Sequence, residues 1–250
     1  MRKYFAVFLL TALISGACAE ADEGSARDLS GIWEGGDPAA AGGMGAIDVT
    51  ANLLPGEEIT LTPYGTQRYK TNNYAKSPAN RCMPYGPTRA LHSTDPQQWV
   101  QTPDMLVILY EQMSHYRMIY TDGRPHAADA QDYPSWMGHS IGRWEGNALV
   151  VDTIAIDERS WLDSGGLEHS EKMHLVERYE ITDANTLKVT ITVEDPVFFV
   201  KPFTYSIVKS RVNPREVPRI LPAICNENEI DAAHIMPLPP SHRTPPTFSQ

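Results

Sequence analysis

Short strand-like segments recur along the chain between residues 105 and 212, and this regular spacing constrains the fold more than any other feature of the sequence. Each segment is rich in Val, Ile, Tyr and Thr, and turn signals such as Asp122-Gly123 and Asp195-Pro196 separate them. The segments predicted to be strands are 105–111, 115–121, 140–144, 148–154, 174–181, 186–194 and 203–212. Short strands separated by turn signals predict an antiparallel meander.

The segment 186–194 has the clearest alternation. Leu187, Val189, Ile191 and Val193 fall on one face of a strand, and the residues between them are polar. Because closure into a barrel removes the exposed edges of a large sheet, we expect an all-β fold: an antiparallel up-and-down barrel with long loops and an irregular C-terminal tail. A β-sandwich with a core tryptophan is the alternative architecture.

The N-terminus has the pattern of a secretory signal peptide. Arg2 and Lys3 precede an apolar stretch, 4–14, and the Ala-Cys-Ala at 17–19 provides a small-x-small cleavage site. The alternatives are a lipoprotein modified at Cys18 and a membrane anchor. The apolar stretch is shorter than the ~20 residues that a membrane-spanning helix needs, so we expect a periplasmic or secreted protein.

The sequence predicts that the chain has three parts. Residues 1–19 are expected to be removed as the signal peptide, and residues 20–234 to form a single barrel domain. The segment 35–48 is rich in Gly and Ala and predicts a flexible loop. Residues 235–250 contain five prolines and predict a disordered tail.

The acidic composition argues against two classes of partner. The chain has 21 basic and 31 acidic residues, a net charge of -10, and removal of residues 1–19 leaves 19 basic and 31 acidic residues, a net charge of -12. Such a surface repels nucleic acid and anionic lipid headgroups. We therefore expect neither nucleic-acid binding nor stable membrane insertion.

Two cysteines, Cys82 and Cys225, remain after the expected cleavage. In an oxidising compartment we expect a disulfide between them, which stabilises the fold by about 4 to 5 kcal/mol in the entropic model because the loop is long. Two buried free thiols are the alternative. Since no closely spaced His-x-x-x-His pair, phosphate loop or dinucleotide fingerprint occurs in the sequence, we expect no metal and no cofactor.

Two resemblances support an exported barrel. The Gly-x-Trp at 31–33 and the late Arg211 resemble the pairing in lipocalin-like (calycin) barrels, in which a basic side chain lies across the indole. The strings GRWEG at 142–146, LVVDT at 149–153 and WLDSGGLEHS at 161–170 resemble a family of uncharacterised exported bacterial proteins. The second resemblance implies fold and export and leaves the chemistry open.

Carboxylates and histidines gather between residues 115 and 178. The candidate catalytic residues are Asp163, His169, His174 and Glu177. A carboxylate beside an imidazole can remove and return a proton, so an Asp163–His169 pair suits a cofactor-free lyase, dehydratase or isomerase. The alternative is that Asp163 caps the backbone of the following turn.

Aromatic side chains are dense in the same region, and they predict a cavity for an apolar ligand with arginines placed over a carboxylate or phenolate. The candidate ligand-binding residues are Arg117, Tyr120, Trp136, His139, Arg143, Trp161 and Arg178. The alternative is that the aromatic rings simply fill the core. The sequence thus favours binding of a small hydrophobic or aromatic molecule, with the cofactor-free enzyme second and a structural module using the Pro-rich tail third.

Overall fold

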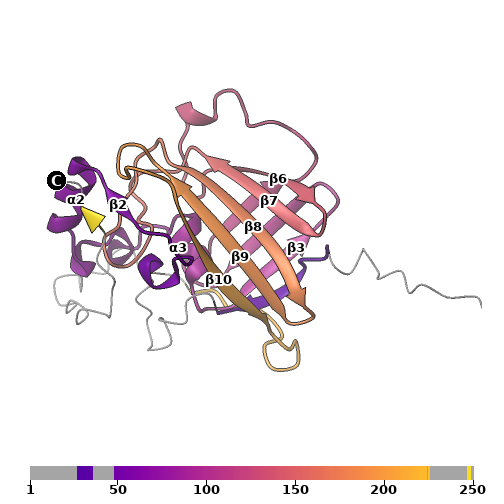
Figure 1. The fold of residues 1–250 in the computed structure, drawn as a ribbon. Helices are drawn as coiled ribbons and strands as arrows, with labels where there is room; N and C mark the ends of the chain where they lie inside the picture. Colours follow the sequence, from indigo (N-terminus) through magenta and orange to yellow (C-terminus); the bar gives the residue numbers. More distant parts are fainter. Residues whose placement is uncertain (1–26, 36–47, 224, 226–246, 249–250) are drawn as a thin grey trace, which may run out of the picture.

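Nine strands close into a barrel (Figure 1). The computed structural model describes residues 27–35, 48–223, 225 and 247–248. The strand order around the barrel is β1-β10-β9-β8-β7-β6-β5-β4-β3. The barrel strands are β1 (Gly31–Glu34), β3 (Gln97–Gln101), β4 (Met105–Tyr110), β5 (Tyr116–Tyr120), β6 (His139–Glu145), β7 (Ala148–Ile154), β8 (His174–Asp183), β9 (Thr186–Glu194) and β10 (Phe203–Arg211). The prediction of an all-β barrel is confirmed.

The alternation predicted for β9 places its apolar residues in the core. Leu187, Val189, Ile191 and Val193 have no exposed surface, and the strand pairs antiparallel with both β8 and β10. Burying a large aliphatic side chain contributes roughly 1.5–3 kcal/mol relative to leaving it in water. The period-two pattern therefore fixes which face of this strand points into the barrel.

One pair of neighbouring strands departs from the predicted meander. Strands β5 and β6 are parallel, and only Ile119↔Ser140 and Tyr120↔Ile141 pair between them. A tight hairpin would make these strands antiparallel. Instead the long connection 121–138 carries the chain back, so that β6 runs in the same direction as β5. The prediction of a wholly antiparallel sheet is wrong at this position, and the seam between the two strands is short.

The barrel closes where β1 lies between β10 and β3. Trp33 is fully buried there, its indole N–H donates to the Leu29 carbonyl, and the Arg211 guanidinium lies 4.2 Å from the ring centroid. Arg211 also donates to the Ser30 carbonyl at 2.6 Å. The predicted contact between a basic side chain and the first tryptophan is therefore present.

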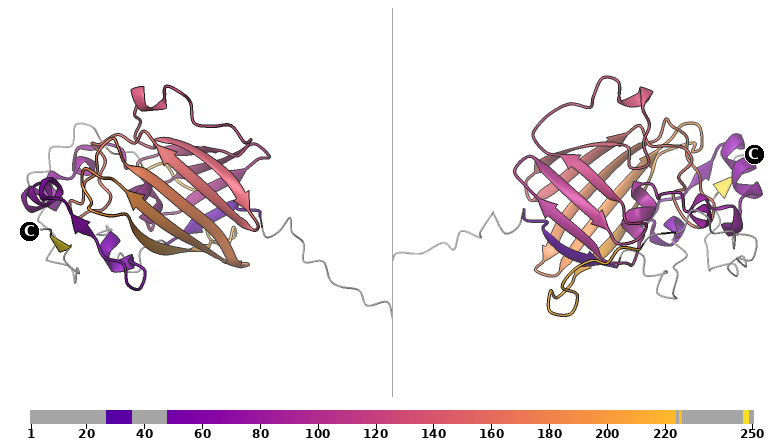
Figure 2. Two further views of the ribbon diagram at one scale, coloured as in Figure 1. Left: turned by 45° about the horizontal axis from the view of Figure 1, so that its top comes forward. Right: turned by 180° about the vertical axis from the view of Figure 1, so that it is seen from behind.

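Short helices and a small two-stranded sheet lie at one end of the barrel (Figure 2). Helix α2 begins after Thr62, whose hydroxyl accepts from the Gly65 N–H, and Pro63 occupies the first helical position. Thr247 and Phe248 pair with β2 in a parallel sheet, so two residues of the predicted disordered tail form a strand. These elements are α2 (Pro63–Thr71), α3 (Pro87–His92), β2 (Thr60–Leu61), β11 (Thr247–Phe248) and the 3-10 helices Val49–Asn52, Tyr74–Lys76 and Pro78–Arg81. A further 3-10 helix, Ala130–Asp132, lies in the connection between β5 and β6.

A disulfide joins Cys82 to Cys225 across 143 positions of sequence, as predicted. Disulfides persist in oxidising compartments, so this bond indicates an extracytoplasmic environment. Three predicted segments lie wholly or largely outside the described residues: the signal peptide, the Gly/Ala-rich segment (residues 36–47) and the end of the domain with most of the Pro-rich tail (residues 226–246).

Candidate functional site

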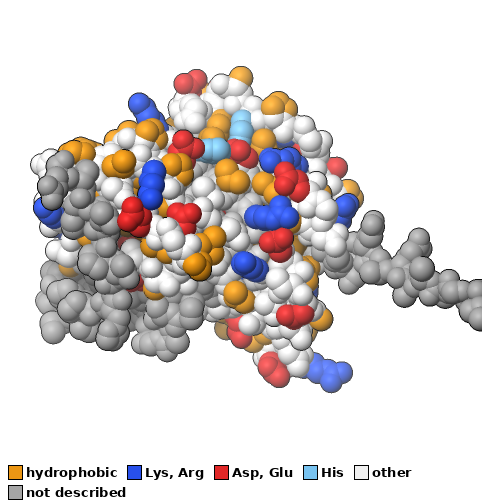
Figure 3. Space-filling view, viewed as in Figure 1, with side chains coloured by type: hydrophobic (Ala, Val, Ile, Leu, Met, Phe, Trp, Pro, Cys, Tyr) orange, Lys and Arg blue, Asp and Glu red, His pale blue; other side chains and the backbone are white. Residues whose placement is uncertain are grey.

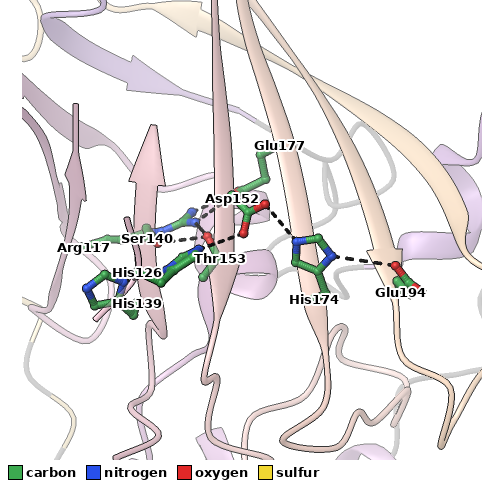
Figure 4. Close-up of polar contacts among 9 residues, drawn as sticks. All are labelled: Arg117, His126, His139, Ser140, Asp152, Thr153, His174, Glu177 and Glu194. Atoms are coloured by element: carbon green, nitrogen blue, oxygen red, sulfur yellow. Dashed lines mark hydrogen bonds and ion pairs between the residues drawn. The ribbon is translucent and has the colours of Figure 1, made fainter. Parts of the chain in front are cut away.

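Strands β6, β7 and β8 carry polar side chains on both faces of the barrel wall (Figure 4). Because successive side chains of a strand point to opposite sides, Asp152 lies outside while Thr153 is buried inside. Two clusters result. The outer cluster consists of Asp152, His126, His139, His174 and Glu194. The inner cluster consists of Arg117, Glu177, Tyr179, Ser140 and Thr153.

Asp152 is the centre of the outer cluster. Its Oδ1 lies 2.9 Å from Nε2 of His126, and its Oδ2 lies 3.0 Å from Nε2 of His174. His126 comes from the connection between β5 and β6, and its Nδ1 lies 2.8 Å from Nδ1 of His139. Beyond His174, Glu194 lies 3.7 Å from the second imidazole nitrogen. The cluster thus crosses four strands, and histidines lie beside acidic side chains on this face (Figure 3).

The protonation of the outer cluster follows from its contacts. Partial burial alone would raise the pKa of Asp152, but the hydrogen bonds from His126 and His174 outweigh this effect and hold the pKa below its ordinary value. Desolvation lowers the pKa of His139, and the neighbouring His126 and Arg124 lower it further. The carboxylate is therefore ionised and His139 is neutral at pH 7.

The inner cluster is centred on Arg117. Its guanidinium donates to both carboxylate oxygens of Glu177, with Nη1 to Oε1 at 2.9 Å and a shorter contact from Nη2 to Oε2. The remaining contacts go to Ser140 at 3.1 Å, Thr153 at 2.8 Å and Tyr179 at 3.3 Å. Five hydrogen bonds thus engage the five N–H groups that a guanidinium offers.

Burial of the inner cluster is complete. Arg117 exposes 1% of its side chain and Glu177 none. Burial alone would lower the pKa of Arg117, but the Glu177 carboxylate raises it, and burial raises the pKa of the Tyr179 hydroxyl. Both charges persist because each compensates the other. This cluster has no guanidinium donor left for a ligand.

A pocket of about 490 Å³ opens beside the short seam, between β5 and the segment 135–140 that leads into β6. Since only two residue pairs join these strands, the wall is not sealed by backbone hydrogen bonds along its whole height. Arg117 and Ser140 of the inner cluster line the pocket, together with His139 of the outer cluster. The apolar lining consists of Pro84, Tyr116, Met118, Tyr120, Trp136 and Met137.

His115 lines the same pocket beside β5. Its Nδ1 lies 3.0 Å from the Gln112 carbonyl, so Nδ1 carries the proton and Nε2 is an acceptor. That Nε2 is buried and has no hydrogen-bond partner among the described residues. Burial lowers the pKa of His115 to about 4, which keeps this ring neutral.

Four of the seven ligand-binding candidates line this pocket: Arg117, Tyr120, Trp136 and His139. The other three do not. Arg143 and Arg178 lie on the outer surface and contact Glu145. Trp161 lines a second pocket of about 700 Å³ next to α2. Tyr120 and Trp136 also lie under the guanidinium groups of Arg124 and Arg159, at 4.1 and 4.7 Å.

The predicted Asp163–His169 pair uses its polar atoms elsewhere. Asp163 Oδ1 accepts hydrogen bonds from the backbone N–H groups of Gly165 and Leu167, as in the alternative interpretation of a turn cap. The two ring nitrogens of His169 contact the Ser160 hydroxyl at 2.8 Å and the Ser170 carbonyl at 3.0 Å. Neither nitrogen is left for Asp163.

The other two catalytic candidates are divided between the clusters: His174 binds Asp152 outside, and Glu177 binds Arg117 inside. Sequence reasoning did not select Asp152, His126 or Ser140. The polar pair 152–153 inside the otherwise apolar strand β7, and the polar pair 139–140 at the start of β6, are the signal that marks both clusters.

Within the described residues, no group of three or more His, Cys, Asp or Glu side chains is arranged to hold a metal ion. No helix in the same part of the chain is long and apolar enough to cross a membrane. Comparison of the chain with protein-family models, curated proteins and solved structures yields no match. The resemblance to exported bacterial proteins therefore stays a prediction.

Proposed function

We propose that this protein is an exported barrel that binds a small hydrophobic or aromatic molecule in the pocket between β5 and β6. One observation carries the proposal. Four residues selected from sequence as ligand-binding candidates, from separate parts of the chain, line one pocket of about 490 Å³. That volume is within the range of sites for small organic molecules.

The lining suits an apolar ligand with few polar groups. Five of the thirteen lining residues are Tyr, Trp or Met, and such side chains bind rings through dispersion and burial of apolar surface. Tyr116 and Met118 are 58% and 40% exposed at the pocket, so apolar surface faces solvent there. A ligand that covers these two side chains removes this surface from water.

Export supports the same function. The disulfide indicates an oxidising compartment, and we place the protein in the periplasm or outside the cell after cleavage of residues 1–19. A binding barrel there needs no energy source or cofactor, only access from solvent. The second candidate function is a cofactor-free lyase, dehydratase or isomerase, favoured by the contact of pocket residue His139 with the imidazole–carboxylate chain of His126 and Asp152.

The test is a titration of the purified protein with a panel of aromatic and terpenoid compounds, followed by tryptophan fluorescence and calorimetry. We expect Trp136→Ala to weaken binding by about tenfold or more, since it removes a wall of the pocket. Tyr133→Ala is the matched control on the same connection, because Tyr133 is 75% exposed and does not line the pocket. Its affinity should equal that of the wild type.

Two further measurements distinguish the two pockets and the two candidate functions. Tyr64→Ala alters the second pocket, so a loss of affinity in this variant with none in Trp136→Ala would move the ligand to the α2 end and contradict the proposal. Product analysis of the same mixtures tests the enzyme. Turnover that disappears in His139→Ala while binding persists would establish the second candidate.

A further inference from the structure

The outer cluster is a hydrogen-bonded chain with a direction. An ionised carboxylate only accepts hydrogen bonds, so Nε2 of His126 must donate to Asp152. With the proton of its ring on Nε2, His126 has its lone pair on Nδ1 and accepts there from Nδ1 of His139. A neutral His139 with its proton on Nδ1 has a lone pair on Nε2.

This remaining lone pair belongs to the residue of the outer cluster that lines the pocket. His139 is the imidazole at the pocket end of the hydrogen-bonded series Asp152–His126–His139. Nε2 of its ring has no hydrogen-bond partner among the described residues. The ring also lies 5.9 Å from the Tyr120 ring, which lines the pocket as well. A ligand that lies on Tyr120 therefore meets a hydrogen-bond acceptor beside an aromatic wall.

We infer that the pocket selects aromatic compounds that carry a hydroxyl group, and that the phenolic O–H donates to Nε2 of His139. This inference rests on the proposed function and specifies its ligand class. An aryl carboxylate fits less well, since its oxygens would face the imidazole lone pair and find the donors of Arg117 already engaged. A plain hydrocarbon would leave the imidazole acceptor without a partner.

His126 and Asp152 are positioning residues in this arrangement. They do not line the pocket, but together they hold the His139 proton on Nδ1 and leave Nε2 as the acceptor. Loss of His126 frees the ring to take either tautomer. Discrimination between a donor ligand and a ligand without a donor should then fall, while the apolar walls stay in place.

The test uses a matched pair of probes, 2-naphthol and 2-methoxynaphthalene, which differ by methylation of the hydroxyl. Calorimetric titration of the wild type should give about fivefold to tenfold tighter binding of the naphthol, the effect of one net hydrogen bond. In His139→Ala the ratio of the two affinities, naphthol to methoxynaphthalene, should fall to about one. His139→Gln keeps an acceptor oxygen and should retain part of the preference for the naphthol. The affinity ratio of His126→Ala should lie between those of the wild type and His139→Ala.

His174→Gln is the matched control, because His174 binds the far oxygen of Asp152 and does not line the pocket. It should keep the wild-type ratio, with circular dichroism checking the fold of each variant. Equal binding of both probes to the wild type would overturn the inference and leave the proposed function standing. So would an unchanged ratio in a folded His139→Ala protein. If neither probe nor any panel compound binds, the proposed function itself fails.

Discussion

Charged side chains have different surroundings on the inner and outer faces of the barrel wall. On the inner face, Glu177 and Arg117 are almost wholly buried, and every donor of the guanidinium is engaged. On the outer face, Asp152 and His174 are 28% and 37% exposed, and Nε2 of the pocket residue His139 has no hydrogen-bond partner among the described residues. The inner cluster is saturated, while the outer cluster is open to a further partner.

This difference assigns structure to the inner face of the wall and function to its outer face. A buried ion pair holds its geometry because losing either partner leaves an uncompensated charge. The half-exposed contacts of the outer cluster stabilise little, since water replaces them at low cost. Chemistry that responds to a ligand therefore belongs to the outer cluster, and the inner cluster supports the wall behind it.

The largest expected effect is on the inner face. Glu177→Ala leaves Arg117 charged and buried, and we expect the free energy of unfolding to fall by about 3–5 kcal/mol in urea titrations. Arg178→Ala is the control one residue away. Arg178 is partly exposed and contacts Glu145 and Glu180 at 3.3 and 3.2 Å, so its loss should cost less than about 1 kcal/mol. Equal costs for the two variants would remove the distinction between the faces.

The loss of stability at acid pH should also come from a buried group. His92 of α3 is fully buried, and desolvation and Lys209 lower its pKa from 6.5 to about 3. The fold therefore opposes its protonation, so stability is lost as the pH falls from 6.5 towards 3 and amounts to about 3 kcal/mol at pH 4. Unfolding titrations at pH 7 and pH 4 should show this loss reduced in His92→Phe and unchanged in His174→Gln. The reverse result would assign acid sensitivity to the outer cluster.

The barrel was predictable because its signals are local. Alternation along β9 and the turn signals follow from residue type and order. The Cys82–Cys225 pairing follows because two cysteines remain after the expected cleavage, and the Trp33–Arg211 contact is what the resemblance to lipocalin-like barrels implies. Helix α2 was not predicted, because its nine residues are too few to show a clear helical periodicity. Its Thr62-Pro63 start was the available signal.

The site was less predictable because it depends on how the chain crosses the barrel. Asp163 and His169 are near in sequence, yet the turn between them directs Asp163 onto its own backbone. His126 and Asp152 are 26 positions apart and meet only because the long connection returns before the parallel strand β6 begins. Sequence order does not encode that crossing.

A smaller effect is expected for a single neutral partner of the inner cluster. Thr153→Val keeps the shape of the side chain but removes the oxygen that accepts from Arg117 at 2.8 Å. An unsatisfied buried donor costs about 1–3 kcal/mol, so we expect a loss of about 1–2 kcal/mol in the free energy of unfolding. The control is Thr192→Val on the outer face of β9, where the Thr204 hydroxyl is the partner and the site is part-buried. That loss should be smaller.

The smallest stability effect should come from the centre of the outer cluster. In Asp152→Asn the amide keeps the size of the side chain but loses the charge that both imidazoles contact. Because the pKa of Asp152 is lowered from 3.8, the carboxylate contributes stability that is present above pH 3.8 and is lost as the pH falls through the lowered value. With the group 28% exposed, we expect a difference from wild type below about 1 kcal/mol at pH 7, shrinking towards zero below pH 3.8. Paired urea titrations across this range measure it, and a loss of 3 kcal/mol or more at pH 7 would make the outer cluster as structural as the inner one.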